Sequence, residues 1–378
     1  MNVKTAETII IGGGISGLAC ARQLQTQNQD FLLISKDIGG RILTSEAGTV
    51  NYGAFFTCSD YYNFLKYAKI QSRIRLRDFC FHEIDDKFVL FEPQLLLYLN
   101  QFLKIRNLLN RFRRSLRFLR KTAETQSQKV LIEADSFLYE LYKKEAIDLI
   151  KEFNLYQVTE KYLSKALYST TFSSISEINA FSFLQFLLPL ITPIYTFIFE
   201  KDKMIESFQE NIFLEKVLDI QRKNNYYKIK TNGKTYHAKN LVLATEISWS
   251  LQFAGVKKVN KPIDTNMLHI QGTPKKCISK KKYQLYSNHC TVQAIASLPD
   301  GTFLLYYKNE QPPLDSFFTK HLVMAHHLWN PAGRINGHFL IECNRGNNMY
   351  LIGDYNIAGL EEAFITGIFA ANQIVQSH

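Results

Sequence analysis

Two glycine-rich turns in the first 41 residues constrain the fold more than any other part of the sequence. Residues 9–11 form an uncharged β-branched run, which predicts a strand buried on both faces. Gly12, Gly14 and Gly17 follow with the spacing G-x-G-x-x-G, which permits a tight turn, close approach of the backbone to a pyrophosphate, and close helix packing. A helix beginning at Ile15 then directs its amides at the phosphates, so the turn predicts a dinucleotide site.

The position that usually carries the ribose-binding carboxylate is occupied by a serine. That carboxylate is expected about 20 residues after the glycines, at the end of the second strand. The second strand is expected over 31–34, and Ser35 and Lys36 follow it. A hydroxyl lacks the charge-assisted hydrogen bond of a carboxylate, so the sequence does not decide which residues contact the adenosine.

The second turn, Ile-Gly-Gly-Arg at 38–41, distinguishes between cofactors. It resembles the signature after the second strand in the superfamily of flavin-containing amine oxidases, phytoene desaturases and protoporphyrinogen oxidases. The resemblance implies that Gly39, Gly40 and Arg41 lie along the FAD pyrophosphate and flavin, and the planar donors of arginine suit phosphate oxygens. Residues 51–55 take the place of the family's acidic-x-glycine segment near the flavin, with asparagine in place of the acid.

The far end of the chain carries an independent match. A strand over 349–352 ends in Gly353 and Asp354, and a helix is expected from Gly359 to about 375. This resembles the closing motif of the same superfamily, in which the aspartate meets the ribityl and pyrophosphate groups and the helix directs its N-terminus at the flavin. A helix dipole there stabilises negative charge on the reduced ring. Glu362 stands where the family usually has glycine, which narrows the space near the ring.

The resemblance therefore implies a set of FAD-contacting residues. In relatives a valine at the position of Val217 contacts adenine through its backbone, and a strand like 241–245 passes close to the dinucleotide; a core strand residue is the alternative for Val217. The full candidate set is Gly12, Gly14, Ile15, Ser16, Gly17, Ser35, Lys36, Gly39, Gly40, Arg41, Gly53, Ala54, Phe55, Val217, Ala244, Gly353, Asp354, Gly359, Leu360, Glu361 and Ala363. No catalytic residue is assigned.

Cysteine and histidine usage indicates non-covalent FAD and no metal. Relatives that tether flavin through cysteine do so near the closing motif, where this sequence has no cysteine after 344. The six cysteines lack C-x-x-C spacing, and the adjacent pair His326 and His327 lacks further ligands, so these residues are assigned structural roles. With no secretory signal before the first strand, a reducing cytoplasm is the expected location.

The chain is predicted to alternate between two domains of an α/β fold. The Rossmann-like FAD-binding domain comprises 1–60, 204–250 and 346–378, and the discontinuous α+β substrate domain comprises 61–203 and 251–345. The first part of the substrate domain reads as helix-rich, with helices over 60–70 and 135–153. The second part reads as sheet-rich, with strands over 267–271, 291–297 and 303–307. The shared interface is where flavin and substrate would meet.

Net charge is +11, which suggests an anionic partner. Residues 94–123 contain eight basic residues and no acidic one, and the apolar residues between 105 and 119 fall on one face of a helix. Two interpretations remain open: a helix lying on an anionic membrane, or a surface helix whose apolar face packs on its own domain. Nucleic-acid binding is not expected, because no recognition motif accompanies the charge.

A second uncharged stretch, 178–199, approaches the length of a bilayer span. Pro189 and Pro193 would break the backbone hydrogen bonds of a lipid-exposed helix. A broken pair of helices inside the substrate domain is therefore expected, as core, tunnel wall or shallow membrane insertion.

These features lead to one functional hypothesis and two alternatives. The leading hypothesis is an FAD-dependent oxidoreductase that abstracts hydride from a C–N or C–C bond of a fairly apolar small molecule, either cytoplasmic or attached peripherally to a membrane. The alternatives are a renalase-like enzyme that oxidises reduced nicotinamides and a catalytically decayed flavoprotein-fold scaffold. The oligomeric state and the electron acceptor are not indicated by the sequence.

Overall fold

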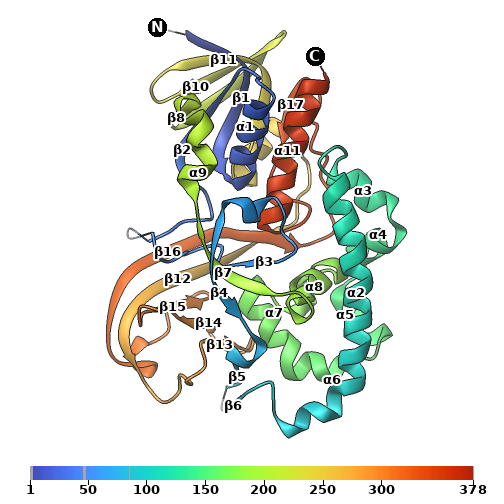
Figure 1. Cartoon of the computed structure of the whole chain (residues 1–378), viewed down its shortest axis with the longest axis vertical. Coiled ribbons are helices and arrows are strands. Elements are labelled where there is room, and N and C mark those ends of the chain that lie inside the picture. Colours follow the sequence, from blue (N-terminus) through green and yellow to red (C-terminus); the bar gives the residue numbers. More distant parts are fainter. Residues whose placement is uncertain (1–2, 46–47, 85, 378) are drawn as a thin grey trace.

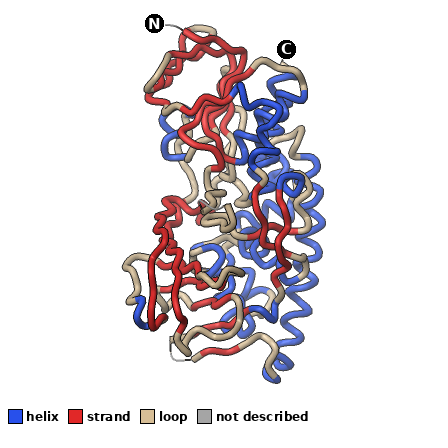
Figure 2. The backbone as a smooth tube through the Cα atoms, turned by 60° about the vertical axis from the view of Figure 1, so that its left-hand side comes forward, coloured by secondary structure: helices blue, strands red, loops and turns tan. Residues whose placement is uncertain are grey.

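The computed structural model describes residues 3–45, 48–84 and 86–377, and two parts are stacked along its long axis (Figure 1). The upper part holds both chain termini and a mostly parallel sheet. The lower part has a second sheet, and its helices gather along the other side of the molecule (Figure 2). The chain passes between the two parts several times.

The upper sheet is built around β1 (Val3–Gly14), in the order β8-β2-β1-β11-β10-β9 with β17 beside β11. Its other strands are β2 (Phe31–Gly39), β8 (Ile212–Leu214), β9 (Val217–Lys223), β10 (Tyr226–Thr231), β11 (Thr235–Leu243) and β17 (Met349–Leu351). β1 pairs in parallel with β2 and β11, so that Ile10 lies between Leu33 and Val242. This sheet thus unites strands from the beginning, middle and end of the chain.

Helices cover both faces of the upper sheet because alternate residues of β1 point to opposite sides. Ile10 packs with α1 (Ile15–Thr26) and α11 (Leu360–Gln376), whereas Ile9 and Ile11 pack toward α10 (Ile247–Ala254). A Cβ on Gly367 would lie 2.2 Å from the Ser16 carbonyl oxygen, so glycine is what allows α1 and α11 to cross closely. Two short helices, α9 (Lys201–Ile205) and η7 (Glu206–Asn211), lead into β8.

The lower sheet has the order β16-β12-β15-β14-β13-β5-β6 and is dominated by two long antiparallel strands. Its strands are β16 (Phe318–Asn336), β12 (Lys261–Pro274), β15 (Phe303–Tyr307), β14 (Val292–Ser297), β13 (Tyr283–Tyr286), β5 (Phe79–His82) and β6 (Lys87–Phe88). A small sheet, β3-β7-β4, comprises β3 (Phe56–Cys58), β7 (Ile194–Phe199) and β4 (Ala68–Ile74). The strands expected over 267–271, 291–297 and 303–307 are present.

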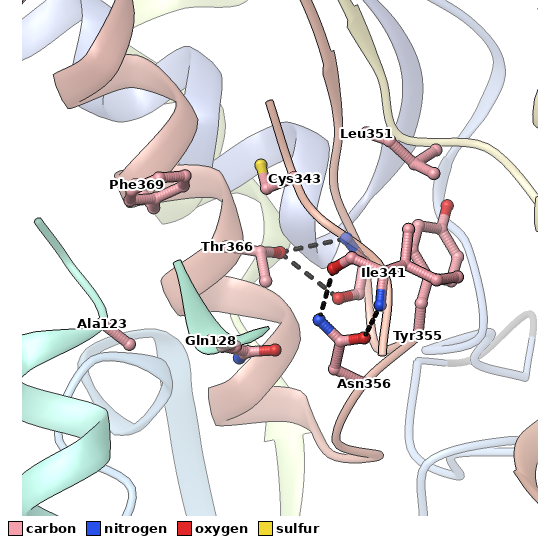
Figure 3. Close-up of a pocket in the computed structure, with 10 residues that line it drawn as sticks. Ala123, Gln128, Ile341, Cys343, Leu351, Tyr355, Asn356, Thr366 and Phe369 are labelled. Carbon is pink, nitrogen blue, oxygen red and sulfur yellow. Dashed lines mark hydrogen bonds between the residues drawn. The ribbon is translucent and has the colours of Figure 1, made fainter. Parts of the chain in front are cut away.

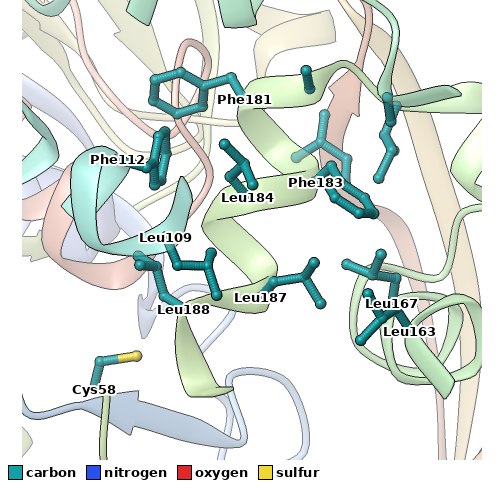
Figure 4. Packing of buried hydrophobic residues seen from close by; sticks show 14 of the residues in the cluster. Cys58, Leu109, Phe112, Leu163, Leu167, Phe181, Phe183, Leu184, Leu187 and Leu188 are labelled. Atoms are coloured by element: carbon teal, nitrogen blue, oxygen red, sulfur yellow. The ribbon is translucent and has the colours of Figure 1, made fainter. Parts of the chain in front are cut away.

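A helical layer covers the lower part. It comprises η3 (Pro93–Tyr98), α2 (Leu99–Thr122), α3 (Gln128–Ala134), α4 (Ser136–Lys143), α5 (Ala146–Glu152), α6 (Tyr156–Val158), the π-helix η4 (Thr159–Leu163), α7 (Ser164–Thr171) and α8 (Ala180–Leu187). Short 3₁₀ turns lie at η1 (Phe64–Tyr67), η2 (Leu76–Asp78), η5 (Ile175–Glu177), η6 (Leu188–Leu190) and η8 (Leu314–Ser316). In Figure 4, Leu109 and Phe112 of α2 face Phe181 and Leu184 of α8.

Two sequence-based expectations about local structure are wrong. A single 3₁₀ turn, η1, and the strand β4 occupy the region where a helix was expected over 60–70. The stretch 178–199 is not a pair of helices: α8 and η6 are followed by the strand β7. Pro193 ends the helical part, and the β-branched and aromatic residues after it pair with β3 and β4.

The apolar face of α2 packs into the chain's own core, as expected if 94–123 is a surface helix packed on its own domain. Ile105, Leu109, Phe112, Leu116 and Leu119 are all at most 2% exposed. In the part of the chain that the structure describes, no helix combines the length and the apolar character needed to cross a bilayer.

Candidate functional site

The first glycine turn is shaped by close backbone contacts. Gly12 has φ +114°, and a Cβ there would lie 2.5 Å from the carbonyl oxygen of Ala244. A Cβ on Gly17 would lie 2.0 Å from the Gly12 carbonyl oxygen. Gly14 differs, since a Cβ on it would meet nothing within 4 Å. Gly14 therefore borders open space at the start of α1, where the first turn has neither a side-chain cap nor an acidic residue. Unpaired amides at that end suit an anionic group such as phosphate.

Ser35 fastens the second strand to this turn. Its hydroxyl accepts the Gly13 N–H at 2.8 Å and donates to the Asp37 carbonyl oxygen at 2.6 Å. The hydroxyl hydrogen is therefore used inside the protein, and only the remaining lone pair of Ser35 can serve a ribose. Gly40, with φ +58°, lies against Gly14, and a Cβ on Gly40 would be 3.0 Å from the Gly14 Cα.

The two ends of the chain meet through an ion pair. Arg41 Nη2 lies 2.5 Å from Asp354 Oδ1, and Arg41 Nη1 donates to the Ala332 carbonyl oxygen at 3.0 Å. Asp354 is the main cause of a raised Arg41 pKa. The Arg41 side chain remains 44% exposed, so it can still reach a ligand. The structure thus brings together the glycine turns predicted at the two termini.

The loop that carries Asp354 is fixed from two sides. Gly353 has φ +146°, its N–H donates to Thr366 Oγ1 at 3.0 Å, and the Thr366 hydroxyl donates in turn to the Ala363 carbonyl oxygen. Asn356 exchanges two hydrogen bonds with the backbone of Ile341 (Figure 3). The cavity in Figure 3, about 10 Å³, is of the size of a water molecule and lies behind this loop.

The segment around Gly53 packs on Arg41. The Ala54 N–H donates to the Arg41 carbonyl oxygen at 3.0 Å, and a Cβ on Gly53 would lie 2.1 Å from that oxygen. Asn51, at the position of the family's acid, is buried and donates to the Phe197 carbonyl oxygen at 2.7 Å. Ala54 and Phe55 are partly exposed beside it.

Three further candidates lie in or next to strands of the upper sheet. Ala244 donates its N–H to the Ile11 carbonyl oxygen at 2.8 Å, directly under Gly12. Val217 lies three residues after Leu214, which pairs with Ser35 at the end of β2. The Val217 side chain is part of the core. Lys36 is exposed.

Two buried glutamates begin α11 and have different partners. Glu361 accepts the backbone N–H groups of Asn63 and Phe64 at 2.9–3.2 Å. Burial raises the pKa of Glu361 to about 7, although these hydrogen bonds and Arg120 oppose the shift. Glu362 Oε1 accepts from Nε and Nη2 of Arg120 at 2.9 and 2.5 Å.

The Arg120–Glu362 pair was not predicted from the sequence. Arg120 is 2% exposed and Glu362 0%, and Glu362 Oε2 is buried with no hydrogen-bond partner among the described residues. Burial opposes the charge on Arg120, but Glu362 outweighs it and raises the arginine pKa. A signal was present: Arg120 follows Leu116 by four residues, on the apolar face of α2. Glu362 is therefore held by Arg120 at the start of α11.

An aromatic and histidine wall combines Tyr52, which precedes Gly53, with side chains of the lower sheet. The Tyr52 hydroxyl lies 3.1 Å from His269 Nδ1, and the Tyr52 ring lies 5.1 Å from the ring of His327. The Trp329 ring would be 3.2 Å from a Cβ on Gly53, and its buried Nε1–H lacks a partner among the described residues. Burial lowers the pKa of both His269 and His327, which favours the neutral form of each imidazole.

No local pattern indicated this wall, because its members come from positions 52, 269, 327 and 329. His326 points elsewhere, to Asn266 and Tyr307, so only His327 of the adjacent pair borders the site. A search of the described residues finds no cluster of three metal-ligating side chains.

Comparisons with known proteins agree on the fold. A family model described as an NAD(P)-binding Rossmann-like domain matches residues 10–69. Wild-type putrescine oxidase bound to putrescine superposes with a TM-score of 0.68 at 11% identity, covering 99% of this chain and 100% of that chain. Cyclohexylamine oxidase from Brevibacterium oxydans IH-35A gives 0.63 at 12% identity, with 98% of each chain covered.

A CLA-producing fatty acid isomerase from P. acnes gives a TM-score of 0.66 at 12% identity, again with 98% of each chain covered. At such identities the likeness shows the fold. The predicted architecture, a Rossmann-like domain joined to a discontinuous α+β part, is confirmed.

Proposed function

We propose that this chain, which has the fold of the flavin-containing amine oxidases, is an FAD-dependent oxidoreductase acting on a C–N or C–C bond of a fairly apolar small molecule. The observation that carries the proposal is the closure of the two terminal turns through Arg41 and Asp354, 2.5 Å apart. An ordinary strand-turn-helix at each end would not require this meeting. Two of the structural neighbours, putrescine oxidase and cyclohexylamine oxidase, are amine oxidases, which supports a C–N bond as the bond acted on.

The residues present fit a non-covalently bound dinucleotide. Gly14 leaves open space at the bare N-terminus of α1, which suits the pyrophosphate. Arg41 offers further donors there, and its neighbour Asp354 suits the ribityl hydroxyls. The positive end of α11 would favour negative charge on a reduced ring. When bound, FAD supplies the two-electron acceptor that side chains lack.

The protein's own part is to bind, orient and exclude water. The wall of Tyr52, His269, His327 and Trp329 has no charge when its imidazoles are in the neutral form that burial favours, and such a wall favours an apolar substrate over an anionic one. The fatty acid isomerase among the structural neighbours indicates that a substrate with a reacting C–C bond is equally compatible with this fold.

Purified protein tests the proposal in two stages. The visible spectrum should show flavin bands, and anaerobic addition of amines or polyenes should bleach them. Arg41→Ala should lower flavin content, whereas Arg222→Ala, which removes an exposed charge on β9, should not. Bleaching only by a reduced nicotinamide would favour the renalase-like alternative. Bound flavin that no reductant of these classes bleaches would favour a decayed scaffold.

A further inference from the structure

The lower end of the molecule carries an apolar tip formed by η3 and the first turns of α2 (Figure 1). Leu96, Leu97, Leu99 and Leu103 are 69%, 76%, 49% and 56% exposed. The tip is adjacent to Tyr156 of α6, itself 67% exposed, because Gln101 hydrogen-bonds both Gln157 and the Val158 N–H. Clustered leucines with this exposure are unusual on a monomer's surface and mark a binding site.

A basic stripe continues from the tip along the outward face of α2. Leu99, Leu103, Arg106, Asn110, Arg114, Phe118 and Lys121 recur at intervals of three or four residues, which places them on one side of the helix. All of them are exposed. The stripe follows a helix of 24 residues, about 36 Å long.

Six of the eight basic residues of α2 fall into two groups with different uses. Arg113 and Arg117 share Asp60 at 2.6 and 2.7 Å, and Arg120 is paired with Glu362. Arg106, Arg114 and Lys121 form no ion pair with any residue that the structure describes. The first group fastens the helix to the protein, and the second is left to attract an anionic partner.

We propose that the apolar tip and the basic stripe dock this protein on the surface of an anionic lipid bilayer. The leucines would enter the boundary between headgroups and acyl chains, and the basic residues would lie at the level of the lipid phosphates. The buried face of α2 stays in the core, so the protein docks as a folded body. This surface does not depend on the proposed redox function.

The same observations disfavour other occupants. A second copy of the chain would bring two sets of unpaired basic residues together without an acidic partner. A nucleic acid would use the basic stripe but would gain nothing from the leucine tip. A bilayer with anionic lipids is the partner that uses both features.

Vesicle flotation with the full-length chain tests the proposal. The protein should float with phosphatidylcholine vesicles containing 30% phosphatidylglycerol and stay unbound with phosphatidylcholine alone. The triple variant R106Q/R114Q/K121Q should lose affinity about a hundredfold, since each basic residue contributes roughly fivefold. The variant L96S/L97S/L103S should lose binding at physiological salt.

The matched control is K223Q/K228Q/K230Q, which removes three exposed charges from the β9–β10 hairpin at the opposite end of the molecule. It should bind like the wild type. The proposal is overturned if the wild type ignores anionic vesicles, if the control loses as much affinity as the α2 variant, or if the leucine variant binds normally. It is also overturned if the leucine variant converts a stable dimer to monomer. Circular dichroism and thermal unfolding check that every variant is folded.

Discussion

The buried pair formed by Arg120 and Glu362 gives the sharpest prediction about stability. It joins α2 of the lower part to α11 of the upper part, and neither side chain is more than 2% exposed. Arg120→Met keeps a side chain of similar length but removes both hydrogen bonds to Glu362 Oε1. Because Glu362 Oε2 has no hydrogen-bond partner among the described residues, the variant would bury a carboxylate that receives no side-chain hydrogen bond from them.

The expected cost follows from the physics of buried pairs. Removing one partner costs about 3–5 kcal/mol, because the other charge stays in a low dielectric. In a chain of this size that corresponds to a fall of roughly 4–6 °C in Tm. Removing both charges is often neutral, so R120M/E362Q should recover at least about 2 kcal/mol of the loss.

Urea unfolding of the four proteins in the cycle measures this coupling. The matched control is Arg117→Met on the same helix, since Arg117 is 52% exposed and shares Asp60 with Arg113. Its cost should stay below about 1 kcal/mol. The reasoning is refuted if Arg120→Met costs no more than Arg117→Met, or if the double variant is as unstable as the single one.

Three further predictions test the site. Glu361→Gln should remove a pH dependence of stability. Because folding raises the Glu361 pKa from 4.5 to about 7, the free energy of unfolding of the wild type should fall by up to about 3 kcal/mol as pH rises between these values. In urea unfolding, the stability of the wild type relative to Glu361→Gln should therefore fall from pH 4.5 to 8. Parallel curves would contradict this. Trp329→Phe removes a buried N–H that has no partner in the described part of the chain, so thermal unfolding should show equal or higher stability. The value of kcat/KM should fall if that N–H binds a ligand. Gly17→Ala, whose Cβ would be 2.0 Å from the Gly12 carbonyl oxygen, should destabilise the protein by about 1–3 kcal/mol or more in the same assay.

The parts of the fold that the sequence predicted are those with a local signal. The glycine turns at Gly12 and Gly40 need particular backbone angles and contacts, and those needs are visible in the chain itself. The place of Arg120 on the apolar face of α2 was visible in the sequence, but its partner Glu362, 242 residues away, could be identified only in the folded structure. The strand β7 was misread as helix because short apolar runs have no distinctive period.

The candidate site divides in the same way. Motifs predicted that the glycine turns lie together at one site, although the use of the Ser35 hydroxyl to hold Gly13 could not be predicted. The aromatic and histidine wall draws on Tyr52, His269 and Trp329, which no spacing connects. They meet because β12 and β16 pair beside the Gly53 segment, which is a property of the tertiary fold.

FAD titration of the apoprotein and its Gly14→Ala variant is the most direct measurement of the central claim. A Cβ on Gly14 meets no protein atom within 4 Å, so the variant should be as stable as the wild type. The same methyl group would occupy the space left for the pyrophosphate, so FAD affinity should fall by more than about tenfold. Wild-type protein that binds no FAD, or equal affinity in both proteins, would contradict a dinucleotide held between the two terminal turns.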